Sequence, residues 1–309
     1  MAILFIIIGS SCKKNNNDPE PKYKFRLTKL VESREGLNNL VVDFRYEGDK
    51  VTGWKDIDGA GTEFNVLFKY LENNVVESTF VDSNNVESGD KHVYTFNGEL
   101  LEKLERYNKV DGEFVLLEKT TYQYNQNGDV TETIKSSFIG GVEQQETKNI
   151  FSYDNNLLAE IIDYYWIQNT WKKTLKKSFQ YENGLLVLLT GDALDNNAWV
   201  PFYKDEFTYP SDDEGVKVSE ISKYVFISED NWSWLTTNAY QYDNNGNMIS
   251  EEVTSSSNDN WSYTYTYEEK SGNLWLFNFN KEYGYPQPFY KSNNQILPGG
   301  QEKAFLFKD

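Results

Sequence analysis

The sequence has few of the residues on which most enzyme active sites depend. Its 309 residues include one Cys, one His and two Met. These counts argue against a disulfide framework, thiol catalysis, a histidine-based triad and a zinc site. We therefore predict no catalytic residue, no metal and no cofactor. Glycine (20) and proline (7) are too scarce for a collagenous or disordered chain, so the chain is expected to fold.

Basic residues are also in deficit. The chain has 30 Lys and Arg against 48 Asp and Glu, a formal net charge of −18. A charge of this sign repels phosphate backbones and anionic lipid headgroups. We predict that the protein binds no nucleic acid.

A long apolar run is missing, because the strongest one, Ala2 to Ile8, falls short of the about 20 residues that cross a bilayer. It is followed by Gly9-Ser10-Ser11-Cys12 and by a polar, Pro-containing stretch. This order resembles a bacterial lipoprotein signal, which implies a signal segment over residues 1–12, lipidation of Cys12 and a tether over 13–24. The implied location is the cell envelope, with a lipid anchor in the outer membrane. The alternative is a short apolar tail with an unrelated cysteine.

Aromatic residues are abundant, at 16% of the chain, and they recur at a fixed spacing. An aromatic anchor, often an aromatic-x-aromatic pair, repeatedly precedes a turn rich in Asn, Asp and Gly. Such turns accept the positive φ of a type I′ hairpin. The mean anchor spacing of about 28 residues suits a two-strand unit. The anchors are Tyr46, Tyr70, Phe96, Tyr124, Tyr153, Tyr181, Tyr209, Tyr242 and Tyr267.

The repeat predicts an all-β fold without a convincing helix. About nine hairpins give an antiparallel meander of about 16–18 strands over residues 25–280. An open sheet of this size curls or closes, so we expect a barrel-like or spiral rolled sheet. Two separate β-domains are the alternative. Residues 281–309, which contain Pro and Gly, form a C-terminal segment that either covers the sheet or begins a further hairpin.

The segment Tyr240-Gln241-Tyr242-Asp243-Asn244-Asn245-Gly246-Asn247 resembles the tyrosine-aspartate (YD, RHS-type) repeat. Residues 40–275 as a whole resemble a Bacteroidota lipoprotein family of unknown function with a porin-like fold. The resemblance implies a rolled β-sheet and supplies no catalytic residues.

A barrel embedded in lipid conflicts with the charges on the strands. Around Trp171 to Gln180, each of the two strand faces carries two lysines. Either face would place them in hydrocarbon, at a cost of about 2–4 kcal/mol each near the midplane. We predict a rolled sheet that is tethered to the membrane and does not span it.

Four tryptophans next to Asn-containing turns form a candidate ligand rim, because aromatic faces beside amides suit sugar rings: Trp171, Trp199, Trp232 and Trp261. The first three precede their anchors by ten residues, so in an unbroken strand each would share the inward face of its anchor. We therefore expect at least two of the three to be core residues, whose truncation costs about 3–5 kcal/mol. For a sugar rim the change in stability stays within about 0.5 kcal/mol.

The titratable residues give no clear catalytic pattern. We interpret His92 as a surface histidine on the strand face opposite Tyr94 and Phe96. Glutamates recur after the turns, but Glu251 is out of register with the others, so we interpret them as solubilising charge. Asp243, Asn245 and Asn247 are interpreted as a hairpin turn because the glycine position does not fit a calcium loop.

These observations favour a non-enzymatic envelope lipoprotein that serves as a binding or scaffolding module. A glycan or an envelope protein is the expected ligand. The alternatives are an exported glycan hydrolase that uses carboxylates and a structural shell of YD repeats.

Overall fold

The computed structural model describes residues 24–34, 39–47, 50–57, 63–82, 84, 86–98, 100–209, 218–228, 231–243, 248–270, 279–280 and 285–286. Cys12 and the predicted tether up to residue 23 lie outside these residues. So do Asn245, Asn247 and most of residues 281–309. Every regular element of the described residues is a β-strand. Within them there is no helix long and apolar enough to cross a membrane.

Eighteen of the strands belong to one sheet, and two short ones pair with each other. Their bounds are β1 (Lys24–Arg34), β2 (Leu40–Glu47), β3 (Lys50–Ile57), β4 (Glu63–Leu71), β5 (Val75–Val81), β6 (Glu87–Asn97), β7 (Leu100–Val110), β8 (Glu113–Tyr124), β9 (Val130–Ile139), β10 (Val142–Asp154), β11 (Leu157–Ile167), β12 (Thr170–Glu182), β13 (Leu185–Asp195), β14 (Ala198–Thr208), β15 (Glu220–Ser228), β16 (Asn231–Tyr242), β17 (Met248–Ser255), β18 (Trp261–Lys270), β19 (Phe279–Asn280) and β20 (Tyr285–Pro286).

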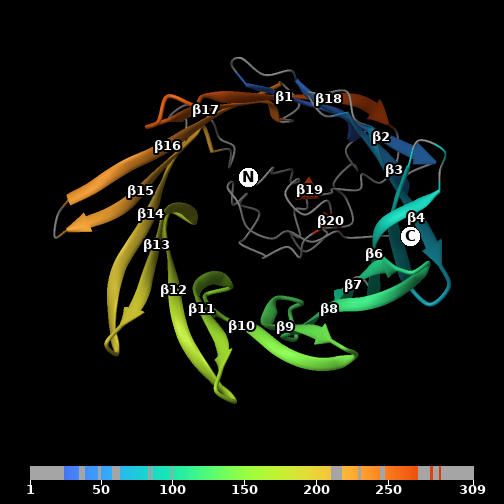
Figure 1. Ribbon diagram of the computed structural model, residues 1–309. Coiled ribbons are helices and arrows are strands. Elements are labelled where there is room, and N and C mark those ends of the chain that lie inside the picture. The colour runs from blue at the N-terminus through green and yellow to red at the C-terminus, as the bar shows by residue number, and fades with distance from the viewer. Residues whose placement is uncertain are drawn as a thin grey trace, which may run out of the picture.

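The large sheet is a meander that closes on itself (Figure 1). Each strand pairs antiparallel with the next, and β1 pairs with β18 along ten residue pairs. The predicted all-β meander of 16–18 strands is confirmed, as a closed barrel. The predicted hairpin units are the pairs β2–β3 to β16–β17. The ninth unit joins β18 to β1, from opposite ends of the chain.

The barrel has two distinct ends. The aromatic anchors lie next to the connections of one end, where Lys24 at the start of β1 also pairs with Lys270 at the end of β18. We name this the terminal end. The opposite end carries the connections that join β5 to β6, β7 to β8, β9 to β10, β11 to β12, β13 to β14, β15 to β16 and β17 to β18.

Turns at both ends have the backbone that the sequence predicted. Asn155 and Asn156 at the terminal end both have positive φ, as do Asn196 and Asn197 at the opposite end. Two successive positive φ values define a type I′ turn, whose twist matches that of the flanking strands. The interpretation of the Asn-rich segments as hairpin turns is therefore confirmed at these positions.

A β-bulge interrupts five of the long strands, seven residues before each anchor. The extra residues are Leu117, Glu146, Thr174, Phe202 and Leu235. Each of these strands pairs with the next hairpin only on the anchor side of its bulge. This pairing begins, for example, at Leu175 of β12 and at Tyr203 of β14. A bulge bends its strand, so the hairpin ends diverge from one another, most visibly from β9 to β16 (Figure 1). We call these five hairpin ends the fingers, and their side of the barrel the finger end.

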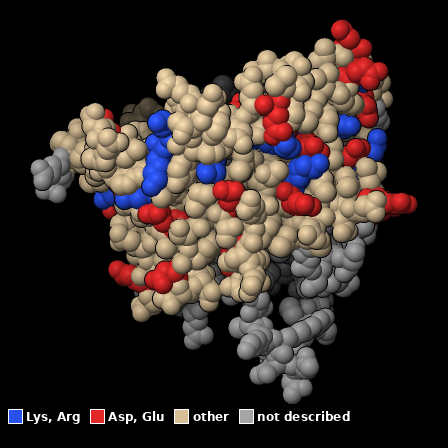
Figure 2. All heavy atoms as spheres, turned by 90° about the horizontal axis from the view of Figure 1, so that it is seen from below, with Lys and Arg blue, Asp and Glu red and all other residues tan. Residues whose placement is uncertain are grey.

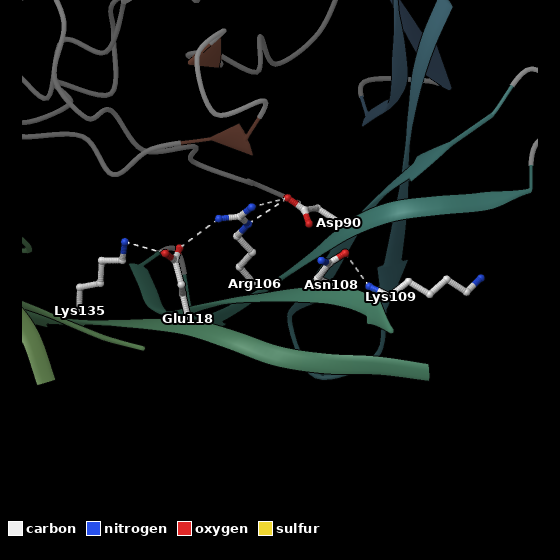
Figure 3. A network of polar contacts seen from close by, with 6 residues as sticks. All are labelled: Asp90, Arg106, Asn108, Lys109, Glu118 and Lys135. Carbon is white, nitrogen blue, oxygen red and sulfur yellow. Dashed lines mark hydrogen bonds and ion pairs between the residues drawn. The ribbon is translucent and has the colours of Figure 1, made fainter. Parts of the chain in front are cut away.

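The anchors lie on the concave face of the ring, which we call the inner face. Figure 3 shows Asp90 on the side of the sheet that faces β19 and β20, inside the ring of Figure 1. Asp90, Tyr94 and Phe96 occupy alternate positions of β6 and therefore share this face. The residues two positions before the anchors are all aromatic and, apart from the partly buried Phe179, all buried: Phe44, Phe68, Tyr94, Tyr122, Phe151, Phe179, Phe207, Tyr240 and Tyr265.

Anchor tyrosines connect successive repeats through one recurring hydrogen bond. The Tyr181 hydroxyl donates to the backbone oxygen of Leu158 at 2.9 Å, and the Tyr209 hydroxyl donates to that of Leu186 at 2.9 Å. Tyr124, Tyr153 and Tyr242 donate in the same way to Leu101, Val130 and Val218. Each accepting residue is a buried apolar side chain near the start of the previous repeat's second strand or just before it. Burial raises the pKa of Tyr181 and Tyr209, so both hydroxyls keep their proton for this bond.

We expect Tyr181→Phe to lower the free energy of unfolding by about 1–3 kcal/mol, because it leaves the buried carbonyl of Leu158 without its donor. Urea unfolding followed by circular dichroism measures this loss. Tyr165→Phe is the control, since Tyr165 is 53% exposed and its loss should stay within about 0.5 kcal/mol. Equal losses in the two variants would contradict a structural role for the anchor hydroxyl.

Candidate functional site

Three of the four tryptophans predicted to form a ligand rim lie near the finger end, on the convex outer face. Trp171, Trp199 and Trp232 are half-buried residues of β12, β14 and β16. The expectation that they share the inner face of their anchors is wrong. The bulges at Thr174, Phe202 and Leu235 each add one residue between tryptophan and anchor and so reverse its face.

Trp261 does not belong to the same row. It lies six residues before Tyr267, and no bulge of β18 intervenes, so it stays on the inner face. There it is partly buried against the main hydrophobic core. The structure therefore brings three of the four predicted residues to equivalent positions and separates the fourth.

A lysine of one repeat lies over an aromatic ring of the next on the outer face. The Lys148 ammonium is 5.1 Å from the ring centroid of Trp171, Lys176 is 5.4 Å from Trp199, and Lys204 is 5.2 Å from Trp232. Lys91 lies over Phe114 in the same way, at 4.6 Å. In the remaining repeat, Lys119 forms an ion pair of 2.7 Å with Glu143, which occupies the position of the ring.

In this lysine–aromatic row the tryptophans form contacts between repeats. Each lysine occupies one of the two ring faces on which a sugar would stack. The lysines also have acidic neighbours, such as Asp192 at 3.0 Å from Lys176 and Glu206 at 2.6 Å from Lys204. Figure 2 shows Lys and Arg side chains in a band across this face with Asp and Glu side chains close to them. The row is therefore not an uncompensated positive surface for an anionic ligand.

We expect Trp199→Ala and Lys176→Met to couple by about 0.5–1 kcal/mol in a double-mutant cycle, the range of an exposed cation–π contact. Thermal or urea unfolding of the four proteins measures the coupling. The control cycle combines Trp199→Ala with Lys172→Met. Lys172 is exposed, and its coupling to Trp199 should be near zero. A loss of 3 kcal/mol or more in Trp199→Ala alone, about that of a fully buried aromatic, would instead indicate a core residue.

Alternating charges cross five strands of the inner face between the aromatic anchors and the finger end (Figure 3). Arg106 donates from Nε and Nη2 to Asp90 at 3.0 and 2.7 Å, and its Nη1 lies 3.6 Å from Glu118. Lys135 contacts Glu118 at 2.8 Å and Glu146 at 3.6 Å. Since the charges alternate and compensate one another, this network ties β6 to β10 together.

His92 adjoins this network, and its predicted surface position is wrong. His92, Tyr94 and Phe96 are two residues apart along β6, so all three lie on the inner face. His92 is 1% exposed. Its ring lies 6.4 Å from that of Phe80 and 6.5 Å from that of Tyr94. Burial first, and the Arg106 guanidinium second, lower its pKa to about 3.

Ser78 is the cross-strand neighbour of His92, and Asp90 lies two residues before His92, which brings the residue types of a catalytic triad together. The chemistry does not fit. Ser78 is 0% exposed and His92 is 1% exposed, so a substrate on the surface does not reach them. A general base needs a pKa near the working pH, and a histidine pKa of about 3 makes the ring a poor proton acceptor at neutral pH.

We expect His92 to make the fold sensitive to acid. Its pKa falls on folding from 6.5 to about 3, so between these pH values the unfolded chain binds a proton that the folded chain does not. The free energy of unfolding is therefore unaffected by this histidine above pH 6.5 and decreases as the pH falls from 6.5 towards 3. Relative to His92→Gln, the wild type should lose about 1.4 kcal/mol per pH unit in this window. Unfolding at several pH values tests this, and parallel pH profiles would contradict it.

Glu251 is a second titratable residue that sequence reasoning misplaced. The prediction that it leaves the register of the other post-turn glutamates is correct, but the interpretation as solubilising charge is wrong, because Glu251 is 2% exposed. It accepts hydrogen bonds from Asn238 Nδ2 at 2.6 Å and from the Tyr265 hydroxyl at 3.2 Å. Burial and then the charge of Glu251 raise the pKa of Tyr240 and Tyr265. This acid is thus held by its neighbours inside the aromatic core.

Metal coordination finds no support among the described residues, which contain no group of three or more His, Cys, Asp or Glu side chains that could hold an ion. The buried ion pair between Lys177 and Asp163, at 2.9 Å, also holds two charges together on the inner face. Nearby, burial raises the pKa of Asp205. Lys177 and Asp163 therefore neutralise each other.

The feature that sequence reasoning missed is a band of exposed apolar side chains at the finger end. Of the thirteen exposed large hydrophobics among the described residues, eleven lie within five residues of a connection at this end. The signal in the sequence was a pair of β-branched residues flanking a turn, such as Ile139 and Val142 around Gly140-Gly141. We call the band the finger rim: Val86, Val110, Val115, Ile139, Val142, Tyr165, Ile167, Val200, Phe202, Ile227 and Leu235.

Comparison with known proteins gives similar structures but no family. No family model matches the sequence, and no curated protein matches it. A porin-like protein from Bacteroides uniformis is 11% identical with a TM-score of 0.40, and one from Bacteroides vulgatus is 12% identical with a TM-score of 0.41. Each comparison covers 78% of this chain and 98% of the other.

A protein of unknown function from Bacteroides fragilis is 16% identical over 38% of this chain and 91% of its own, with a TM-score of 0.34. These three similar structures come from Bacteroides, which agrees with the group to which the sequence resemblance pointed. At these identities and TM-scores they carry no argument about the function of this chain.

Proposed function

We propose that this chain is a non-enzymatic lipoprotein of the cell envelope, anchored in the outer membrane through Cys12, whose barrel is a binding or scaffolding module built of YD-type hairpin repeats. Its ligand is a glycan or an envelope protein. The observation that carries the binding role is the finger rim, where exposed apolar side chains gather at one end of the barrel. A concentration of exposed apolar side chains at one edge favours an interaction surface.

The barrel is attached to the membrane and does not span it. Support comes from the outer face, where Lys119, Lys148 and Lys176 lie in the middle of β8, β10 and β12. A lysine on a lipid-facing surface costs about 2–4 kcal/mol at the bilayer midplane. Several such residues around one ring oppose insertion far more strongly than a single one.

The non-enzymatic assignment is supported by the state of the inner-face acids. Glycoside hydrolysis needs two carboxyl groups that flank an accessible bond. Glu251 is 2% exposed, and the acids of the network in Figure 3 are ion-paired. This favours a binding role over the hydrolase alternative. The finger rim favours binding over the shell alternative, since a shell requires no exposed apolar edge.

Anchoring is tested by Cys12→Ser in cells. We expect the wild type to incorporate a radiolabelled fatty acid and to sediment with the outer membrane. The variant should lose both properties, because no other cysteine is available. Labelling that survives the substitution would refute the lipid anchor. A glycan array probed with the variant then decides between glycan and protein as the ligand.

A further inference from the structure

The positions of the two chain ends fix the direction in which an anchored barrel points. Lys24 pairs with Lys270, so the chain enters and leaves the barrel at the terminal end. Cys12 precedes Lys24 by twelve residues, which span at most about 40 Å even when fully extended. The fingers lie at the other end of strands of up to 13 residues, about 40 Å away along the strand. A barrel tethered through Cys12 therefore carries its finger rim on the side away from the anchor.

The composition of the finger rim indicates what kind of surface it fits. Ile139 and Val142 are each 63% exposed, and they flank the uncharged turn Gly140-Gly141. The next two finger turns, Gln168-Asn169 and Asn196-Asn197, are also uncharged. Apolar side chains exposed to this degree gain free energy when a partner removes them from water.

The charges next to the rim narrow the choice of partner. Exposed acids lie in or beside several finger turns, namely Asp111, Glu113 and Asp195. The chain as a whole carries a net charge of −18, so a second copy would be repelled. A partner with Lys or Arg around an apolar patch would bury the rim and neutralise these carboxylates at its edge.

We propose that the finger rim is the membrane-distal docking surface for a protein that presents an apolar patch flanked by Lys and Arg residues. The orientation relative to the membrane rests on the proposed lipid anchor. The docking surface itself does not, because it follows from the exposed side chains and charges of the described residues.

Docking is tested with a synthetic peptide of alternating Leu and Lys and the full chain carrying Cys12→Ser, which removes the anchor. Fluorescence anisotropy of the labelled peptide measures binding. The rim variant is Ile139→Ser with Val142→Ser, and the matched control is Leu71→Ser with Ile249→Ser. Leu71 and Ile249 are also exposed, but they lie at the terminal end. Circular dichroism and a melting curve confirm that each variant is folded.

We expect the rim variant to bind the peptide at least tenfold more weakly than the parent, and the control variant to bind it as the parent does. A peptide of alternating Leu and Glu should not bind. Equal binding by the rim variant and the control would overturn the docking surface. Rim-dependent self-association in sedimentation, or rim-dependent flotation with phosphatidylcholine vesicles, would assign the rim to a second copy or to a bilayer and overturn the protein partner.

Orientation is tested with the lipidated protein in vesicles, using energy transfer from a single label to a headgroup acceptor. Gln126→Cys labels the terminal end and Glu113→Cys the finger end, both at exposed residues. Transfer should be stronger from position 126. Stronger transfer from 113 would overturn the orientation alone. Failure of the protein to join the vesicles would refute the lipid anchor and leave the docking result standing.

Discussion

The bulge seven residues before five of the nine anchors is the constraint on which the rest of the structure depends. One extra residue reverses the face of every side chain beyond it, so Trp171 and Trp199 lie on the outer face although each precedes its anchor by ten residues. The same residue marks the point at which neighbouring hairpins stop pairing. The bulges at Leu117, Glu146, Thr174, Phe202 and Leu235 thus divide the barrel into a paired body and a set of separate fingers.

The paired body is held by contacts that each repeat makes with its neighbours, as in repeat proteins generally. On the inner face a tyrosine hydroxyl reaches back to a carbonyl of the previous repeat. On the outer face a lysine reaches forward to a ring of the next. Such an array would end in two exposed strand edges. The long ladder between β1 and β18 removes them by joining the first strand to the last.

The structure also separates the residues that serve the fold from those left to interact. His92 and Glu251, which by residue type are candidates for chemistry, are enclosed by aromatic rings and hydrogen-bond donors. Arg106 and Lys135 are enclosed by carboxylates. The finger rim has no such compensation among the described residues, and its apolar side chains stay exposed. The proposed binding role therefore rests on this edge of the barrel and not on its interior.

The sequence by itself determined the strand count, the repeat, the type I′ turns and the aromatic inner face, because each depends on local rules of alternation and of backbone φ. It did not determine which face Trp171, Trp199 and Trp232 occupy, since parity holds only along an unbroken strand and the bulge residues Thr174, Phe202 and Leu235 share no side-chain type. Burial of Glu251 likewise depends on Asn238 and Tyr265, which only the barrel brings next to it. A bulge is set by pairing between two strands, and burial by the packing of several, so only the tertiary structure decided them.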